Sequence, residues 1–354
     1  LYVSASHNPI GHNGFKFGVR GGVLESAEEE KVKSIFLLHM DDGIAERMRT
    51  FSASVSEESY RTVLKHHETV KRRSLRYYAS FVLHTAHADD DAMIPFGIVV
   101  DFNGSARSAS IDIPFLRSHG ADVLALNSVP GQIVHGIIPE GRNLDDARKA
   151  LEKAYRRNPR FILGYVPDND GDRGNFVYIA RNGKACALSA QEGFALVSSI
   201  ELAHAVMMHP GRKAAIAVNG PTSLLLDDIA SRLGVEVFRS DIGEANVVSL
   251  ADRLRREGYS VPICGEGSNG GCIVYPAKVR DPMNSLMAIA KLWSVPGLYG
   301  FLMKALGKKG RAVSIDAVLS AFPEYLMTPS SSPDAVLGIR SRDWPMMKRE
   351  YVRI

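Results

Sequence analysis

The chain has 354 residues, 45% of them hydrophobic and 23% charged, with a formal net charge of +4, which is typical of a globular protein of about two or three domains. This small positive charge allows an anionic substrate but is not the clustering of basic residues that nucleic-acid binding needs, and no stretch approaches the ~20 apolar residues of a membrane span. The three cysteines show no paired spacing, which argues against a disulfide framework or a zinc site, and we expect a cytoplasmic protein with no nucleic acid, membrane or obligate protein partner.

Residues 1–90 begin with a short apolar strand that has no Met and no polar residue before it, and the strand runs into a loop rich in Ser, His, Asn and Gly. We expect these residues to be the back part of an α/β domain whose other strands lie upstream of residue 1. A basic run, Lys71–Arg73, falls in a helix-like stretch, where a solvated helix face explains it better than a nucleic-acid site.

An α/β cycle follows in residues 91–190, where short apolar runs alternate with amphipathic stretches. Gly120 and Asn158 stand where the two helices should end, Asn143 is a candidate N-cap, and Asn182 with Gly183 is a hairpin turn signal. The sequence therefore predicts strands at Phe96–Asp101, Asp122–Leu126, Phe161–Val166 and Phe176–Ile179, and helices at Ser105–His119 and Asn143–Arg157.

The cycle restarts near residue 190. It predicts helices at Gln191–His209, Ser223–Leu233 and Glu244–Glu257, and strands at Ala214–Val218, Val235–Arg239 and Val261–Cys264. Strands that alternate with helices of this length indicate an α/β fold with mostly parallel sheets, and two such cycles indicate two domains of similar build. We predict domains at residues 1–90, 91–190 and 191–306, followed by a linker-like segment at 307–354 that completes no α/β cycle.

The sequence PDNDGDRG directly follows the apolar strand that ends at Val166, and α/β proteins place ligands beyond such strand ends. Alternate residues of an extended loop project to one side, and three aspartates alternate here: Asp168, Asp170 and Asp172. Their carboxylates repel one another unless a cation lies among them, and oxygen ligands favour Mg²⁺ or Ca²⁺. An EF-hand does not fit, because Arg173 and Ile179 stand where it needs Gly and Glu. The alternative is an acidic surface turn.

The sequence GEGSNGG at residues 265–271 matches the G-x-G-x-x-G pattern of dinucleotide-binding sites. That pattern needs a helix after it, whereas strand-like residues follow here, so we reject a dinucleotide site. A glycine-rich hairpin remains, whose backbone can approach a ligand while Glu266, Ser268 and Asn269 hydrogen-bond hydroxyl groups. A plain hairpin is the alternative.

The opening loop places Ser6 beside His7, but it has no nucleophile-elbow pattern, and adjacent side chains on an extended strand diverge. Its surroundings favour a phosphate site, because many side chains there can donate hydrogen bonds: His7, Asn8, His12, Asn13, Lys16 and Arg20. A phosphorylated serine carries about −1.5 to −2 charges at neutral pH and needs Mg²⁺ or cationic partners. A serine in an ordinary turn is the alternative.

Three motifs in one order carry a family resemblance: SASHNP with NGFK, then DNDGDR, then GEGSNGG followed by Arg280, Asp281 and Pro282. Together they resemble the α-D-phosphohexomutases, the phosphoglucomutase and phosphomannomutase family, over roughly residues 1–295. The resemblance implies successive related α/β domains with mixed, mostly parallel sheets around a central cleft. It also implies a segment that lacks the N-terminal part of domain 1 and most or all of the C-terminal domain.

The resemblance implies an isomerase, an intramolecular phosphotransferase that interconverts hexose 1-phosphates and 6-phosphates of glucose or mannose. Mg²⁺ is the implied cofactor, and glucose 1,6-bisphosphate the implied intermediate or activator. Ser6 would carry the phosphate and hold the metal together with the three aspartates. The other implied catalytic residues are His7, Lys16 and Arg173, and the expected substrate-binding residues are Asn8, Glu266, Ser268 and Asn269.

Two features depart from the family pattern. The arginine-serine-glycine-threonine loop that grips the phosphate not being transferred does not occur in the sequence, and GEGSNGG is longer than the commoner GEMSG or GEESG forms. The preference for glucose, mannose or an amino sugar is therefore open, and Lys16 and His7 are both candidates for the general base. Two other functions remain open: a Mg²⁺-dependent phosphatase that hydrolyses phospho-Ser6, and a sugar-phosphate-binding protein without turnover.

Overall fold

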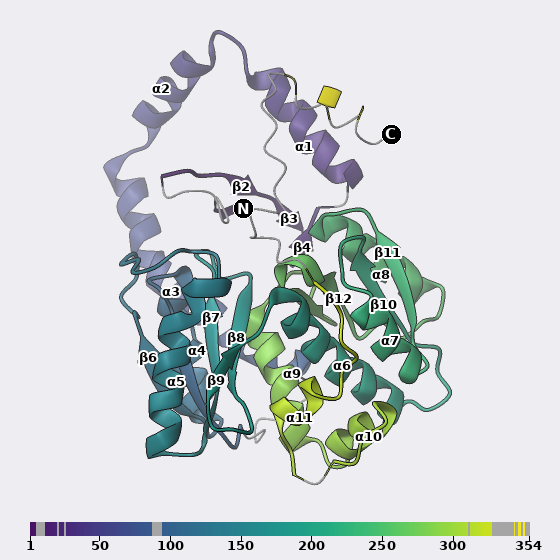
Figure 1. The fold of residues 1–354 in the computed structure, drawn as a ribbon. Helices are drawn as coiled ribbons and strands as arrows, with labels where there is room; N and C mark the ends of the chain where they lie inside the picture. The colour runs from purple at the N-terminus through teal and green to yellow at the C-terminus, as the bar shows by residue number, and fades with distance from the viewer. Residues whose placement is uncertain are drawn as a thin grey trace.

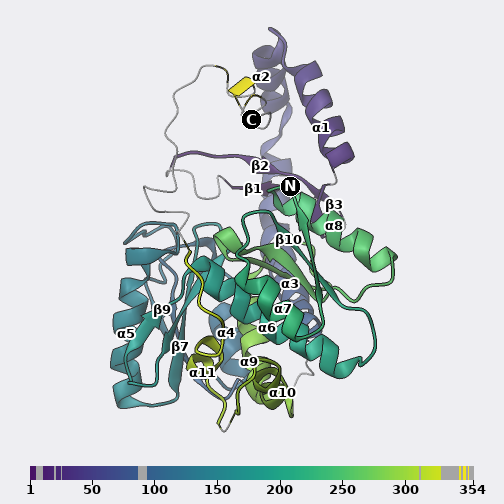
Figure 2. The same ribbon diagram turned by 45° about the vertical axis from the view of Figure 1, so that its right-hand side comes forward.

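The computed structural model describes residues 1–4, 11–19, 21–24, 26–86, 94–310 and 312–327, with residues 343, 346, 347 and 350. Most of these residues form two α/β lobes, and the N-terminal strands and first helices extend away from the lobes (Figure 1, Figure 2). The predicted α/β fold with mixed sheets is therefore confirmed.

The first lobe contains a five-stranded sheet with its helices. Its elements are β5 (Gly97–Asp101), η1 (Ala106–Ala109), α4 (Asp112–Ser118), β6 (Asp122–Leu126), η2 (Gly141–Leu144), α5 (Asp145–Arg157), β7 (Phe161–Pro167), β8 (Gly174–Ile179) and β9 (Ala185–Ala187). The strand order is β6-β5-β7-β8-β9, in which the first three strands are parallel and β8 is antiparallel to both of its neighbours, β7 and β9. The apolar run of β5 is buried throughout, as expected of a strand that is covered on both faces.

The second lobe contains a four-stranded sheet. Its elements are α6 (Ala190–Met208), β10 (Ala215–Asn219), α7 (Leu225–Arg232), β11 (Glu236–Ser240), α8 (Glu244–Arg256), β12 (Ile263–Glu266), η3 (Gly267–Asn269) and β13 (Gly271–Val274). The strand order is β11-β10-β12-β13, with the first three strands parallel and β13 antiparallel.

Both sheets share one topology. In each, the first strand in chain order lies between the second and the third, and the fourth pairs antiparallel with the third. The two lobes are thus of similar build, as predicted, whereas the exact domain bounds stay a prediction. The two glycine-containing motifs occupy equivalent places, since each joins the third strand of its sheet to the fourth.

One hydrophobic cluster is continuous through both lobes. Its buried residues come from β5, α6, β10 and α9 (Pro282–Ser294). α6 and α9 pack against each other and are buried over most of their length. α6 starts at a capping box between Ser189 and Glu192, and Asp281 caps α9 with Pro282 in the first turn. The sequence prediction includes neither α9 nor the two helices that follow it, α10 (Leu298–Ala305) and α11 (Ile315–Leu319).

The N-terminal segment contributes two small antiparallel pairs and three helices. Its elements are β1 (Tyr2–Val3), β2 (Phe15–Lys16), β3 (Gly18–Val19), β4 (Gly22–Val23), α1 (Ser26–His39), α2 (Ile44–Ser54) and α3 (Glu57–Thr85). α3 joins the core only near its C-terminal end, where it packs against α9. The basic run Lys71–Arg73 lies on the exposed part of α3, so the predicted solvated helix face is confirmed.

One helix and one helix cap in the first lobe are predicted wrongly. The segment predicted as one helix, Ser105–His119, is the short η1 followed by α4, because Ser110 between them has an extended backbone, with φ −96° and ψ −161°. Asn143 is not an N-cap, since its Nδ2 donates to the carbonyl of Ile138 at 2.8 Å and α5 begins at Asp145. In both cases the structure overrides the local sequence signal.

Within the described residues, no single helix combines the length and apolar character of a membrane span. Among the described helices, the pair α9 and α10 passes such a test when taken together, and these two helices are bent by 98° relative to each other.

An ion pair inside the second lobe links α6 to α9. Lys291 Nζ lies 2.7 Å and 2.8 Å from the two carboxylate oxygens of Glu201, and both side chains are 2% exposed. Each charge is therefore stabilised almost entirely by the other.

We predict that Lys291→Met, which leaves Glu201 unpaired in the core, lowers the free energy of unfolding by about 3–5 kcal/mol. Adding Glu201→Gln should recover most of the loss, because no unpaired charge then stays buried. Urea denaturation followed by circular dichroism measures both values. An equal or larger loss in the double variant would contradict the prediction.

Candidate functional site

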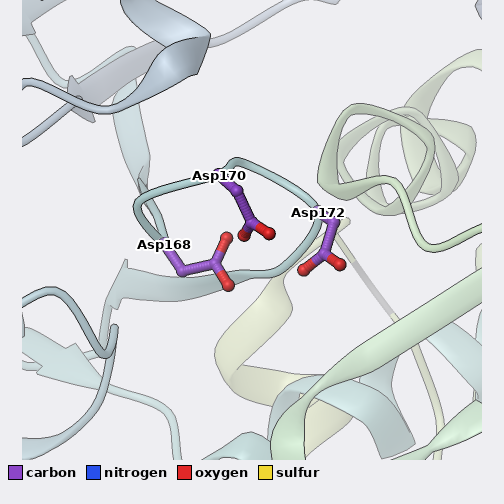
Figure 3. A group of neighbouring side chains, drawn as sticks. All are labelled: Asp168, Asp170 and Asp172. Carbon is purple, nitrogen blue, oxygen red and sulfur yellow. The ribbon is translucent and has the colours of Figure 1, made fainter. Parts of the chain in front are cut away.

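Three carboxylates meet on the loop between β7 and β8. One oxygen from each of Asp168, Asp170 and Asp172 lies within 4.8 Å of the others, and Figure 3 shows Asp168 and Asp170 within the turn of the loop with Asp172 beside them. The alternation in the sequence thus brings these side chains together, as predicted. We call residues 167–174 the acidic loop.

Asp168 is the buried member of the group and shapes the acidic loop from within. Its Oδ1 accepts hydrogen bonds from the backbone N–H groups of Gly171 and Arg173 at 3.0 and 3.1 Å, and its Oδ2 accepts from Arg173 Nε at 2.9 Å. Burial and the neighbouring charge of Asp172 raise the pKa of Asp168 well above its usual range, although Arg173 opposes them.

In Asp170 and Asp172 the Oδ2 atom accepts the hydrogen bonds from the protein, while the Oδ1 atom of Asp172 lies 3.7 Å from Arg173 Nε, an ion-pair distance. The Oδ2 of Asp170 accepts from Ser4 Oγ, and the Oδ2 of Asp172 accepts from Arg280 Nη2 at 2.7 Å. Lys16 Nζ lies 3.4 Å from both of these oxygens. The Oδ1 atoms of Asp170 and Asp172 are buried and have no hydrogen-bond partner within the described part of the chain.

These buried oxygens fit a hard divalent cation. Carboxylate oxygens are the ligands that Mg²⁺ prefers, and a partner on the second oxygen of each carboxylate orients the first one. Burial raises the pKa of Asp172, but Arg280 and Lys16 outweigh it and hold that pKa below its usual value, so the carboxylate stays ionised and able to bind a cation.

The N-terminal strands contact the acidic loop directly. Tyr2 on β1 donates from its hydroxyl to the carbonyl of Asp170 at 2.9 Å, and Lys16 on β2 lies 5.4 Å from the centre of the Tyr2 ring. A cavity of about 380 Å³ opens beside these contacts. Its charged lining residues come from three parts of the chain: Lys16, Asp172, Glu244 and Arg280.

Glu266 organises the loop between β12 and β13 from a buried position. Its Oε1 accepts from Asn219 Nδ2 and from the backbone N–H of Gly243, at 3.1 and 3.0 Å. Its Oε2 accepts from Asn269 Nδ2 at 3.0 Å. Asn219 also donates to Ser268 Oγ at 3.3 Å, so the three residues predicted to bind the sugar form one connected network in this structure.

Arg280 links this network to the acidic loop, a role that the sequence prediction does not include. Its guanidinium lies 2.7 Å from Asp172, 3.4 Å from Glu244 and 3.5 Å from Glu266. A Cβ on Gly271 would lie 2.5 Å from Arg280 Cδ. The absence of a side chain at this last glycine of GEGSNGG therefore leaves room for the aliphatic part of Arg280. The only sequence signal for Arg280 is its place in the three-residue motif that contributes to the family resemblance.

The structure therefore brings together eight of the predicted site residues in or beside two loops: Lys16, Asp168, Asp170, Asp172, Arg173, Glu266, Ser268 and Asn269. Arg173, predicted as catalytic, is buried against Asp168. Ser6, His7 and Asn8 lie outside the described residues, and the roles assigned to all these residues stay predictions.

Comparison with known proteins supports the resemblance. The family model for phosphoglucomutase/phosphomannomutase, alpha/beta/alpha domain III, matches residues 196–298. A probable phosphoglucosamine mutase of Methanopyrus kandleri is 28% identical over 92% of this chain and 60% of its own length. A phosphoglucomutase/phosphomannomutase of Thermococcus kodakarensis is 28% identical over 83% of this chain and 57% of its own length.

The crystal structure of a phosphoglucomutase/phosphomannomutase family protein from Burkholderia thailandensis shares the fold. Its TM-score is 0.59 at 17% identity, and the match covers 92% of this chain and 59% of that one. The likeness to the phosphohexomutases is thereby confirmed. The chain spans about 60% of the length of these proteins.

We predict that Asp170→Asn weakens Mn²⁺ binding by about tenfold or more. Replacing a residue that only hydrogen-bonds to a metal ligand already changes metal affinity by about that factor. Mn²⁺ shares the oxygen ligands of Mg²⁺ and is read directly by electron paramagnetic resonance. Asp145→Asn, which changes a half-exposed aspartate on α5, is the matched control and should bind Mn²⁺ like the unchanged protein. Equal affinity in the two variants would refute a cation site at the acidic loop.

Proposed function

We propose that this chain is part of a Mg²⁺-dependent phosphohexomutase, which interconverts hexose 1-phosphates and hexose 6-phosphates through a phosphorylated Ser6 and a hexose 1,6-bisphosphate. The observation that carries the proposal is the contact between β1, β2 and the acidic loop. β1 and β2 flank the predicted phosphoserine loop. Ser4, which follows β1, and Lys16 on β2 contact the carboxylates that fit a divalent cation. A phosphate donor and its metal need this proximity.

Phosphoryl transfer depends on positioning and on charge stabilisation. Bound at the aspartates, Mg²⁺ would supply neutralisation of the charge on the transferring group. Lys16 lines the cavity beside Asp172 and can donate to phosphoryl oxygens there. Arg173 would contribute indirectly, because its guanidinium donates a hydrogen bond to Asp168 and holds that carboxylate in place.

In the transfer itself, the bond between Ser6 Oγ and phosphorus breaks while a bond forms from phosphorus to a sugar hydroxyl oxygen. The proton of that hydroxyl passes to a base, for which Lys16 and His7 are the candidates, and Ser6 Oγ takes up a proton as it leaves phosphorus. After the sugar reorients, its other phosphate returns to Ser6 by the same step in reverse. If the bisphosphate dissociates before the second transfer, Ser6 is left without a phosphate. Glucose 1,6-bisphosphate would then be needed as an activator to restore it.

The names of the relatives support a proposal for the substrate class. Their names include phosphoglucosamine mutase and phosphoglucomutase/phosphomannomutase, so we propose a hexose phosphate of the glucose, mannose or glucosamine type. Side-chain amides and hydroxyls of the GEGSNGG loop, Asn269 and Ser268, would contact the sugar hydroxyls. The cytoplasmic location indicated by the cysteine pattern stays a prediction.

We predict that the protein purified from its source without phosphatase treatment carries phosphate on Ser6. Intact-mass measurement and peptide mapping detect it, and labelled glucose 1,6-bisphosphate should restore it after phosphatase treatment. Ser6→Ala is the control that cannot be labelled. An unmodified Ser6 that also resists labelling would rule out the mutase.

We also predict isomer formation that depends on Mg²⁺, measured by coupled assays on the 6-phosphates of glucose, mannose and glucosamine. Asp170→Asn should abolish this turnover while the melting temperature changes little, because Asp170 lies on a loop and not in the core. Release of inorganic phosphate in excess of isomer would indicate a phosphatase instead. Binding of sugar phosphate without any exchange of phosphate would indicate a binding protein.

A further inference from the structure

A buried cluster of polar side chains lies behind the acidic loop and connects it to α3 and α9. It consists of Tyr78, Arg107, Asp112 and Asp281, and we call it the joint. We propose that Arg107, together with Tyr78 and Asp281, positions the acidic loop for cation binding, so that the packing of α3 against the lobes tunes the metal site. This inference rests on the proposed function only in that the acidic loop binds a divalent cation. None of the three residues is among those predicted from the sequence to act on substrate or metal.

Arg107 on η1 is the centre of the joint and is 9% exposed. Its Nε donates to Asp112 at 2.9 Å and its Nη2 to the Tyr78 hydroxyl at 2.9 Å, while Nη1 lies 3.3 Å from Asp281. The Tyr78 hydroxyl donates in turn to the Asp281 carboxylate, at 2.9 and 2.8 Å. The guanidinium thus joins α4, α3 and the start of α9 in a single network.

The acidic loop rests on the aliphatic stem of Arg107. A Cβ on Gly171 would lie 2.5 Å from both Cγ and Cδ of Arg107, and Gly171 has a φ of +77° that glycine adopts without strain. The backbone of the loop is also tied to η1, since Ala106 N–H donates to the carbonyl of Asn169 at 3.0 Å. A shift of Arg107 therefore moves the backbone that carries Asp170 and Asp172.

Three consecutive residues after β13 contact either the acidic loop or Arg107. Arg280 binds Asp172 at 2.7 Å, Asp281 binds Arg107 and Tyr78, and Pro282 lies where a Cβ on Gly174 would be only 2.9 Å away. Asp281 also caps α9 by accepting from the backbone N–H of Met283. The motif that follows GEGSNGG is thus the place where α9 begins and where the acidic loop is fixed.

The chemistry of the joint requires an arginine. A guanidinium donates in several directions at once from one rigid plane, whereas a lysine ammonium is a single point charge on a flexible stem. Lysine at position 107 would keep a cation near Asp112 and Asp281 but could not reach Asp112, Asp281 and Tyr78 together. Because the guanidinium of Arg107 binds Asp112, Asp281 and Tyr78 and not the three aspartates of the acidic loop, we treat it as a positioning residue, and its loss should change the affinity of the loop for a cation.

The test compares Tyr78→Phe with Tyr77→Phe. Tyr78→Phe removes the hydroxyl that connects Arg107 to Asp281 and changes no charge, whereas Tyr77 is the neighbouring residue on α3 and is 69% exposed. We expect Tyr78→Phe to weaken Mn²⁺ binding about tenfold, the lower end of the range for partners behind metal ligands. Tyr77→Phe should leave the affinity unchanged.

Arg107→Lys is the second variant, chosen because it keeps the buried charge and so the balance with Asp112. We expect it to weaken Mn²⁺ binding at least as much as Tyr78→Phe does. Mn²⁺ affinity is measured by electron paramagnetic resonance on the full chain, beside the melting temperature without metal. A purely structural joint would lower the melting temperature and leave the Mn²⁺ affinity of the folded protein unchanged.

Two outcomes separate the failure of this inference from the failure of the proposed function. If the unchanged protein binds Mn²⁺ and both variants bind it equally well, the positioning role of Arg107 is refuted while the metal site stands. If the unchanged protein binds no Mn²⁺, the metal site of the proposed function fails, and the positioning role fails with it.

Discussion

Electrostatic repulsion among three carboxylates within 4.8 Å of one another is the constraint on which the site depends. Two like charges about 4 Å apart repel by about 4 kcal/mol at the effective dielectric of a protein surface. The described structure offsets this repulsion with cations from three separate segments: Lys16 on β2, Arg173 in the acidic loop and Arg280 after β13. The acidic loop can therefore be stable only where the N-terminal strands and both lobes come together.

The shared topology of the two lobes explains why the functional motifs meet. In each sheet the motif joins the third strand to the antiparallel fourth, so both loops project from the carboxyl ends of parallel strands. In each loop a glycine packs against the aliphatic part of an arginine at a distance that leaves no room for a Cβ. Gly171 packs in this way on Arg107, and Gly271 on Arg280. The same local solution thus fixes the acidic loop and the GEGSNGG loop, each through a guanidinium that binds carboxylates from other elements.

Local patterns in the sequence predict the strands and most helices of both lobes, and the alternation of the aspartates predicts their convergence. They do not predict what depends on contacts between distant residues. Arg107 and Asp281 are 174 positions apart, and nothing near either one indicates their pairing. The break at Ser105–His119 is likewise not indicated by the local pattern: Ser110, between η1 and α4, has an extended backbone. Glu266 could be identified as a site residue from its loop, but its four contacts come from β10, from the turn before α8, from its own loop and from Arg280.

The balance of charge around the site favours a bound cation. Glu244 and Glu266 join the three aspartates around Lys16, Arg173 and Arg280, so acidic side chains outnumber basic ones by two among these described residues. A divalent cation would reduce this excess of negative charge. It would also give ligands to the two buried oxygens of Asp170 and Asp172 that otherwise lack a hydrogen-bond partner within the described residues. Charge and hydrogen bonding thus both favour a cation at the acidic loop, and that cation would make the positions of Arg280 and Arg107 functionally important, because they orient its ligands.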